Sequence, residues 1–388
     1  MGENTVFSDD KQFVANTYAR FDIAIAHGHG STLVDVDGRE YIDCATGIGV
    51  NAFGINDEEW KNAVGEQINK IQHVCNLYYA EPQAKLAKLL CGRTGAKKVF
   101  FGNSGAEANE CAIKTARKYS YDKYGEGRYE IITLKDSFHG RTMATLTATG
   151  QDAFHKNFAP FLDGFKYAEP NMKGIIGCYT DKTCAVMVET IQGESGVNVL
   201  GGEFLSALEN FCKERDILFI IDEVQTGNGR TGYLYSYEAY GLHPDIVTTA
   251  KALGGGLPIG ACMMFEKAEK TLSFGDHGST FGGNPVACAG AYSIIERIDK
   301  NLLLEVQGKG AYLREHIARI KNVTEVTGEG LMIGIGTTKP AREIAQKCLD
   351  KGLIVLTAHR RIRLLPPLII TKNEMDEALK ILNEVIAE

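Results

Sequence analysis

Continuous apolar runs alternate with amphipathic segments along the middle of the chain. The runs at 98–101, 130–134, 183–189 and 217–221 predict buried strands, and segments 106–119 and 202–215 predict helices between them. Strands that are apolar at nearly every position are typical of a parallel sheet covered on both faces. The pattern therefore predicts an α/β fold with a mostly parallel central sheet.

The two ends of the chain show a different pattern. Segment 32–43 alternates apolar and polar residues around Asp37-Gly38, which predicts a β-hairpin. Helical periodicity recurs at 58–71, 81–91, 287–298, 302–320 and 374–386. We expect a large α/β domain over residues 61–285. A smaller α+β domain would be built from both termini, with segment 1–60 joining residues 286–388.

Composition narrows the class of protein. The 388 residues carry a net charge of −7, which disfavours nucleic-acid binding because that requires a basic face. The ten cysteines are scattered without a CxxC pair, which predicts buried, reduced thiols and no metal site. The first residues lack an apolar signal segment, and no run approaches the roughly 20 residues of a membrane span. We expect a cytoplasmic protein that binds neither nucleic acid nor membrane.

A strand-to-helix loop is the first candidate for chemistry. In the segment 100–109, Ser104, Gly105 and Ala106 stand where a helix begins, so their N–H groups lack partners within the helix. Such a helix start attracts a phosphate, and the Ser104 hydroxyl adds a donor. The loop matches neither a P-loop nor the dinucleotide pattern GxGxxG. Ser104 is equally typical of a plain N-cap.

An acid follows the apolar run at 218–221. Asp222 is expected at the carboxyl end of a parallel strand, where ligands bind in such sheets. A carboxylate there needs a cationic partner, and a protonated pyridine nitrogen is suitable. Val224 would face the ring and Gln225 would reach its hydroxyl. The alternative is that Asp222 caps a helix or binds an arginine.

Lys251 follows the run 246–249 and precedes the glycines at 254–256. Only a neutral amine attacks a carbonyl, so an imine-forming lysine must be partly desolvated. A lysine considered alone is more often a solvated surface charge. Together with Asp222, however, Lys251 indicates an imine site for a cationic ring, which points to pyridoxal phosphate.

Two further residues follow the strand at 130–134. Phe138 is suited to stacking on a cofactor ring, and Arg141 to binding a substrate carboxylate through two hydrogen bonds. Considered alone, Phe138 is more typical of a core residue. Arg141 is equally typical of a surface ion pair.

These segments, in order along nearly the whole chain, resemble the class III pyridoxal-phosphate aminotransferases of fold type I, the ornithine/acetylornithine type. The likeness extends from Tyr18-Ala-Arg20 through 189–194 and 277–285 to Arg363-Leu-Leu-Pro-Pro367. It implies Lys251 as the Schiff-base lysine and proton carrier. Cofactor contacts would come from Asp222, Gln225, Phe138, Gly105 and Ala106.

The resemblance also implies substrate and partner contacts. Thr280 would bind the phosphate of a neighbouring subunit, which makes a homodimer part of the site. Ser279 and Arg141 would contact an acylated amino acid. Glu194 and Arg363 resemble the family's switch pair, in which the glutamate masks the arginine until 2-oxoglutarate binds. The implied reaction is ping-pong amino transfer from an acetylornithine-like ω-amine to 2-oxoglutarate, in arginine biosynthesis.

Alternatives remain within and beyond this chemistry. Ornithine, succinylornithine, 4-aminobutyrate and succinyl-diaminopimelate are rival donors, although the small segment Gly47-Ile48-Gly49 favours room for an acyl group. The aminomutase of glutamate 1-semialdehyde shares the fold, and a non-enzymatic cofactor-binding protein is a third class. The chain departs from common family patterns at Thr190 and Asn228. Arg360 and Arg361 add positive charge near the expected carboxylate site, or are solvated surface residues.

Overall fold

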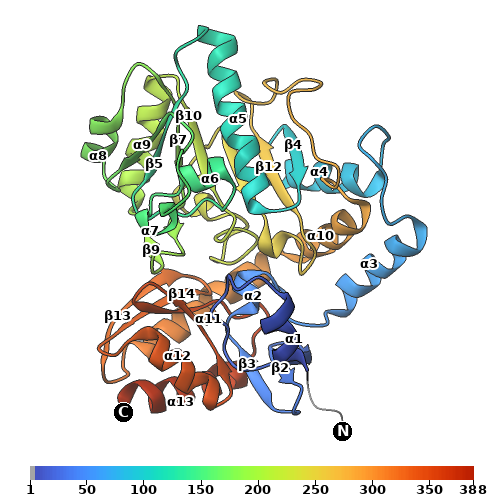
Figure 1. The fold of residues 1–388 in the computed structure, drawn as a ribbon, viewed down its shortest axis with the longest axis vertical. Coiled ribbons are helices and arrows are strands. Elements are labelled where there is room, and N and C mark those ends of the chain that lie inside the picture. The colour runs from blue at the N-terminus through green and yellow to red at the C-terminus, as the bar shows by residue number, and fades with distance from the viewer. Residues whose placement is uncertain (1–4) are drawn as a thin grey trace.

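The computed structural model of the chain describes residues 5–388. Figure 1 shows an upper body built around a large sheet and a lower body that contains N-terminal segments, in blue, and C-terminal segments, in red. In spatial order, the strands of the large sheet are β4 (Lys98–Gly102), β12 (Gly260–Met264), β11 (Ile246–Thr249), β10 (Leu218–Asp222), β7 (Thr183–Val188), β5 (Glu130–Leu134) and β6 (Phe165–Ala168). Neighbouring strands are parallel except where β12 pairs antiparallel with both β11 and β4. The prediction of a mostly parallel sheet is confirmed.

The apolar strands pack into cores on both faces of this sheet. Successive side chains alternate between faces. Ile220 and Leu218 therefore pack with helix α5 (Gly105–Tyr124), whereas Phe219 and Ile221 pack with helix α9 (Gly202–Glu214) on the other face. The remaining helices of this body are α3 (Glu58–Lys70), α4 (Glu81–Thr94), α6 (Met143–Ala148), α7 (Asp152–His155), α8 (Met172–Cys178) and α10 (Pro285–Arg297).

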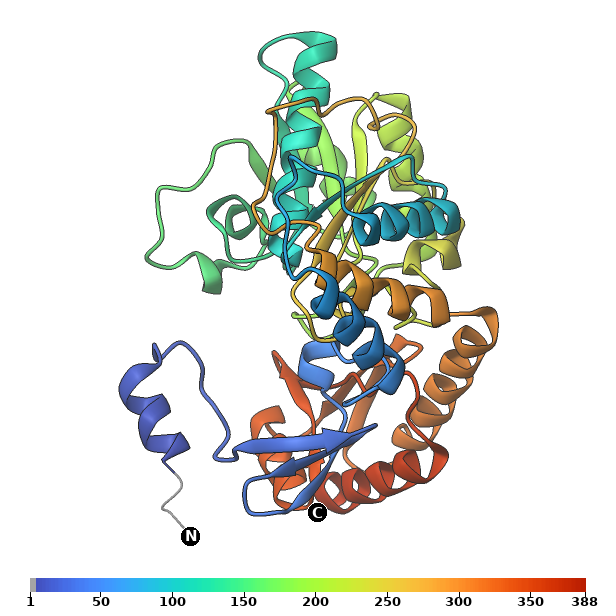
Figure 2. The same cartoon turned by 90° about the vertical axis from the view of Figure 1, so that its right-hand side faces the viewer.

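The lower body is built from segments near both ends of the chain. Its first sheet contains β1 (Ile25–His29), β2 (Thr32–Asp35), β3 (Glu40–Asp43) and β15 (Leu353–Ile354). Its second sheet contains β13 (Val323–Glu329), β14 (Met332–Thr337), β17 (Arg361–Leu364) and β16 (Leu356–Ala358). Helices α11 (Lys300–Ile317), α12 (Ala341–Asp350) and α13 (Lys372–Ala387) cover them. Helix α1 (Val6–Phe13) has no buried residue and lies beside this body (Figure 2).

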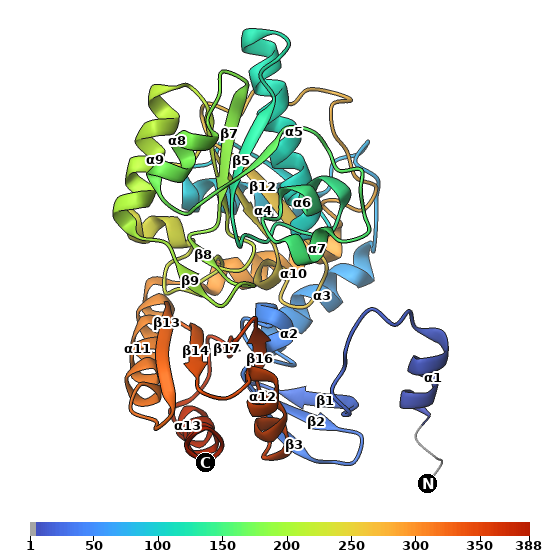
Figure 3. The same ribbon diagram turned by 60° about the vertical axis from the view of Figure 1, so that its left-hand side comes forward.

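Five short elements complete the fold. They are α2 (Thr46–Gly49), β8 (Ile191–Gln192), β9 (Asn198–Val199) and the 3₁₀ turns η1 (Ser236–Tyr240) and η2 (Lys251–Leu253). Figure 3 shows β8 and β9 between the upper sheet and the lower strands β13 and β14.

Some predicted boundaries shift. Helix α5 continues to Tyr124 and ends at Gly125, whose φ of +79° suits glycine. Helix α10 packs on α3 and α4, and its apolar residues belong to the core of the upper body. The division of the chain at about residues 60 and 285 stays a prediction. Among residues 5–388, no helix has both the length and the apolar character needed to span a bilayer.

Candidate active site

A cavity of about 430 Å³ opens where α5 begins and where β10 and β11 end. The carboxyl edge of parallel strands is where an α/β sheet places its ligands. Nine of the residues predicted from the sequence line this cavity: Ser104, Gly105, Ala106, Phe138, Arg141, Asp222, Val224, Gln225 and Lys251.

One end of the cavity is formed by the start of α5. Ser104 is the N-cap of the helix, and its hydroxyl accepts a hydrogen bond from Glu107 N at 3.2 Å. The hydroxyl keeps its own hydrogen to donate, so capping is compatible with anion binding. A Cβ on Gly105 would lie 2.7 Å from Val224 Cγ1, so this site requires glycine. The backbone therefore approaches the cavity closely, at the positive end of a 20-residue helix.

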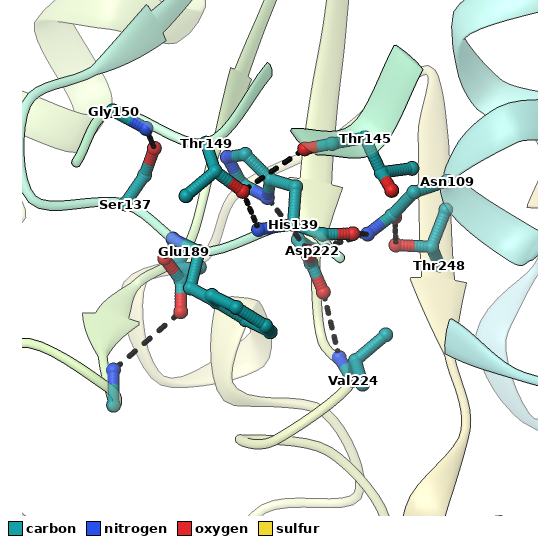
Figure 4. A network of polar contacts seen from close by, with 12 residues as sticks. Asn109, Ser137, His139, Thr145, Thr149, Gly150, Glu189, Asp222, Val224 and Thr248 are labelled. Carbon is teal, nitrogen blue, oxygen red and sulfur yellow. Dashed lines mark hydrogen bonds and ion pairs between the residues drawn. The ribbon is translucent and has the colours of Figure 1, made fainter. Parts of the chain in front are cut away.

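Asp222 ends β10 and lies in a buried network of hydrogen bonds (Figure 4). Its Oδ2 accepts from Asn109 Nδ2 at 2.8 Å and lies 2.8 Å from His139 Nδ1. Its Oδ1 accepts from Val224 N at 3.0 Å. A carboxylate oxygen has two acceptor positions. Oδ1 therefore keeps capacity for a donor in the cavity, while Oδ2 is held by the protein.

His139 and Asn109 were not among the residues predicted from the sequence. Burial acts to lower the pKa of His139, but its hydrogen bond to Asp222 and the charge of that carboxylate outweigh burial and raise the pKa. Asn109 Oδ1 accepts from Thr248 Oγ1 at 2.6 Å, so β11 fixes the amide that contacts Asp222. His139 directly follows Phe138 in the sequence, and this position could have indicated its role at the site. Asn109 lies inside a helix, and nothing in the sequence around it indicated such a role.

Glu189 is a third residue that the prediction missed. It lines the cavity and accepts from Phe138 N at 2.9 Å. Burial raises the pKa of Glu189 to about 7, with a further contribution from the charge of Asp222 that His139 opposes. This carboxyl therefore orients the segment that carries Phe138.

Phe138 and Arg141 lie together at the cavity. The Phe138 ring meets Phe154 edge-on, with 5.6 Å between ring centroids. The Arg141 guanidinium lies 4.2 Å from the Phe154 centroid. Arg141 is exposed, and within residues 5–388 it forms no ion pair with a carboxylate. Its hydrogen-bond donors are therefore available to a ligand, as the carboxylate-binding role requires.

Lys251 begins the turn η2 with a φ of +49°, a conformation that a non-glycine residue rarely adopts. Burial lowers the pKa of Lys251 to about 8, against the opposing charge of Glu194. The indole of Trp60, the only tryptophan, donates to Gly254 O at 2.9 Å and so supports the glycine turn that follows. The amine is therefore closer to neutrality than a surface lysine.

Beside the cavity, Glu194 is paired with Arg363, with 2.8 Å between Oε1 and Nη1. Gln225 joins both: its Nε2 donates to Glu194 Oε1 at 3.0 Å, and its Oε1 accepts from Arg363 Nη1 at 2.8 Å. Burial acts to raise the pKa of Glu194, but the charges of Arg363 and Lys251 lower it to about 2. Gln225 thus binds the ion pair here, and its contact with a cofactor oxygen stays a prediction.

Ser279 and Thr280 lie away from the cavity lining. Ser279 Oγ accepts from Asn103 Nδ2 at 3.1 Å and from Gly282 N at 2.9 Å. Thr280 is exposed in a separate surface hollow that also includes Asn103. Their predicted contacts with substrate and with a neighbouring subunit's phosphate stay predictions.

The cavity fits pyridoxal phosphate. Its positive end at Gly105 suits the phosphate, and Asp222 Oδ1 suits the ring nitrogen. Phe138 lines the same cavity, and Lys251 supplies a desolvated amine.

Comparison with known proteins agrees with this geometry. The family model described as "Aminotransferase class-III" matches residues 13–386. The acetylornithine aminotransferase of Haemophilus ducreyi is 47% identical, over 98% of each chain. The structure of N-acetylornithine aminotransferase from Stenotrophomonas maltophilia has a TM-score of 0.86, with 34% identity and 98% coverage of both chains.

A further similar structure is that of ornithine aminotransferase from Toxoplasma gondii, reported with partial occupancy of pyridoxal phosphate at its active site. It has a TM-score of 0.94 and 29% identity, and the match covers 100% of this chain and 94% of the other. The fold is therefore fold type I, as predicted. The chain belongs to the class III aminotransferases, and its cofactor is pyridoxal phosphate.

Proposed function

We propose that the protein transfers the terminal amino group of N2-acetyl-L-ornithine to 2-oxoglutarate, giving N-acetyl-L-glutamate 5-semialdehyde and L-glutamate. The relative from Haemophilus ducreyi and the similar structure from Stenotrophomonas maltophilia both carry the acetylornithine name. One observation carries the proposal. The Glu194–Arg363 pair contacts the cavity through Gln225, so one arginine is masked while Arg141 is open.

The cofactor would be held by residues at both ends of the cavity. The N–H groups at Gly105 and Ala106, with Ser104, would bind the phosphate, and Asp222 would bind the ring nitrogen. When bound, pyridoxal phosphate supplies a cationic ring into which negative charge from the reacting carbon spreads. Asn109 and His139 hold Asp222 Oδ2, and this network would keep the carboxylate in place for that nitrogen.

Lys251 would hold the cofactor and then act as a base and an acid. Desolvation brings its pKa to about 8, close to the working pH, where a group both accepts and releases protons readily. The freed amine would take a proton from the donor carbon and return it on the cofactor side. Phe138 and Val224 also line the cavity and place apolar side chains in it.

The two arginines would bind carboxylates of different substrates. Arg141, which lines the cavity, would bind the α-carboxylate of the acylated donor. With Glu194 in place, Arg363 is neutralised and the terminal amine enters without meeting a free cation. When 2-oxoglutarate binds, Glu194 would turn away and Arg363 would bind the second carboxylate. Gly47 and Gly49, which precede the cavity residue Val50, would leave room for the acyl group.

The proposal includes a homodimer, in which Thr280 would bind the cofactor phosphate of the neighbouring subunit. In support, large apolar side chains are exposed on two segments: Phe281, which follows Thr280, is 59% exposed, Leu77 is 89% exposed, and Tyr79 is fully exposed. Asn76 Nδ2 donates to Ser279 O at 3.2 Å, so segments 76–79 and 279–282 lie together. We place the reaction in the cytoplasm, where the ten free cysteines would stay reduced.

Single-turnover reactions with a panel of donors test the proposal. N2-acetylornithine, ornithine, succinylornithine, 4-aminobutyrate and succinyl-diaminopimelate would each be mixed with the cofactor-loaded protein, and the loss of absorbance near 420 nm recorded. We expect the largest rate per molar donor for N2-acetylornithine, and recovery of absorbance on adding 2-oxoglutarate. A faster reaction with another donor would show that this donor, and not N2-acetylornithine, is the preferred substrate. Turnover of glutamate 1-semialdehyde without 2-oxoglutarate would identify an aminomutase.

A further inference from the structure

Arg361 connects the two segments that carry the switch pair. It begins β17, the strand of Arg363, and its Nη1 donates to Gly196 O at 2.7 Å and to Asn198 Oδ1 at 2.7 Å. Its Nε donates to Glu325 Oε1 at 2.9 Å. The guanidinium therefore bridges the turn after Glu194 to strand β13.

The turn that Arg361 contacts is held in an unfavourable conformation. It joins β8 to β9, and Gly196 has a φ of +122°. Val197 has a φ of +62° and is fully buried, although a β-branched residue avoids this region of backbone space. Such a conformation persists only when surrounding contacts hold it. Asn198 Nδ2 also donates to Ser195 Oγ at 3.1 Å, so the residues that Arg361 contacts are themselves tied to the turn.

Strand β17 thus holds the β8–β9 segment at two points. Residues two apart on a strand face the same side. Arg363 contacts the Glu194 carboxylate and Gly193 O, while Arg361 contacts the turn at Gly196. The charge of Arg361 is matched by Glu325, with 2.7 Å between Nη2 and Oε1. Arg361 is therefore committed to the protein and is not a second carboxylate-binding arginine.

We propose that Arg361 is a positioning residue that sets the balance between the two substrates. This inference rests on the proposed function, because it concerns the same Glu194–Arg363 switch. By fixing the backbone of the turn, Arg361 restricts Glu194 to movement of its side chain and favours the masked state. Without it, the turn relaxes and Glu194 leaves Arg363 more readily. The masked state suits the ω-amine, so binding of the amine weakens relative to binding of 2-oxoglutarate.

The neighbouring arginine provides a matched control. Arg360 is exposed and, within residues 5–388, no hydrogen bond or ion pair joins it to another residue. Arg361→Met and Arg360→Met remove the same charge one position apart. Arg361→Lys keeps the charge but not the branched set of donors. Asn198→Ala removes one partner from the other side of the contact.

KM would be measured for N2-acetylornithine and for 2-oxoglutarate with each cofactor-loaded variant. For Arg361→Met we expect KM for N2-acetylornithine, divided by KM for 2-oxoglutarate, to rise about fivefold. This change corresponds to part of the energy of hydrogen bonds to a charged group. Arg361→Lys and Asn198→Ala should shift it less, and Arg360→Met should leave it unchanged. Hydrogen exchange of a peptide covering 193–200 should be faster in Arg361→Met than in Arg360→Met.

Equal KM ratios in Arg361→Met and Arg360→Met would overturn the inference, and so would equal exchange. If Arg361→Met does not fold, Asn198→Ala decides by the same two measurements. The exchange experiment needs no substrate. Inactivity of the unaltered protein on both substrates would therefore refute the proposed function, while the exchange comparison would still show whether Arg361 fixes the turn.

Discussion

Glu194 and Arg363 form an ion pair at the edge of the cavity, with Oε1 and Nη1 2.8 Å apart and Gln225 hydrogen-bonded to both. The two side chains of the pair differ in their exposure to solvent. The side chain of Arg363 is only 3% exposed, whereas that of Glu194 is 25% exposed. Arg363 is therefore the fixed partner, and Glu194 is the one with room to move.

Glu194→Gln should reverse the substrate balance. The pKa of about 2 keeps Glu194 charged throughout the working range, so the amide removes a full negative charge. Arg363 keeps its hydrogen bonds to Gly193 O and Gln225 Oε1 and becomes open to a carboxylate. We expect KM for 2-oxoglutarate to fall and KM for the ω-amine to rise, each by about tenfold. Steady-state kinetics with both substrates measure this.

A variant at Arg141 provides the control for this prediction. Arg141→Gln should raise KM for the acylated donor, because it removes the open guanidinium that lines the cavity. Unchanged KM values in Glu194→Gln, with a normal effect in Arg141→Gln, would show that the ion pair does not select substrates.

Capture of pyridoxal phosphate by Lys251 should depend on pH in one direction. The neutral amine attacks, and its fraction rises with pH through the pKa of about 8. We expect the capture rate of cofactor-free protein to increase about tenfold per pH unit below 8 and to level off above it. Stopped-flow absorbance between pH 6 and pH 10 follows the reaction.

Two results would count against this interpretation of Lys251. One is a capture rate that keeps rising to pH 10, the range of an ordinary lysine. The other is an unchanged absorbance step in Lys251→Ala, which has no amine to react. Quenching of the single tryptophan, Trp60, reports binding without capture, because its indole contacts the turn that follows Lys251.

The sequence predicted those parts of the site that depend on one segment at a time. Asp222 ends a strand, Lys251 comes shortly after one, and Gly105 begins a helix, so local pattern was enough to place them. The network around Asp222 and the cluster around Arg363 depend on pairs that are distant along the chain. Asn109 is 113 residues from Asp222, and Gln225 is 138 residues from Arg363. A buried polar residue inside a helix looks the same in sequence whether or not it has such a partner.

Thr248→Val should weaken cofactor binding through Asn109. The two side chains have similar shapes, so the main change is loss of the hydrogen bond to Asn109 Oδ1. A buried carbonyl oxygen left without a donor costs about 1–3 kcal/mol of folding free energy. We expect a lower free energy of unfolding and a several-fold higher Kd for pyridoxal phosphate, measured by Trp60 fluorescence. Thr133→Val, in the buried strand β5, is the control, because Thr133 Oγ1 has no hydrogen-bond partner among residues 5–388.

Tyr79→Asp should disrupt the proposed homodimer. The ring is fully exposed in one chain, and Phe281 nearby is 59% exposed, so burial of both in a second copy would stabilise the dimer. A charge on that surface would have to be desolvated on association, which opposes it. We expect sedimentation to give a dimer for the unaltered protein and a monomer for Tyr79→Asp. The monomer should bind pyridoxal phosphate more weakly, because Thr280 of the second subunit is lost from the phosphate site.

Tyr121→Asp, on an exposed part of α5, changes a similar side chain and should leave both properties unchanged. A dimeric Tyr79→Asp protein with normal cofactor affinity would refute this assignment of the interface.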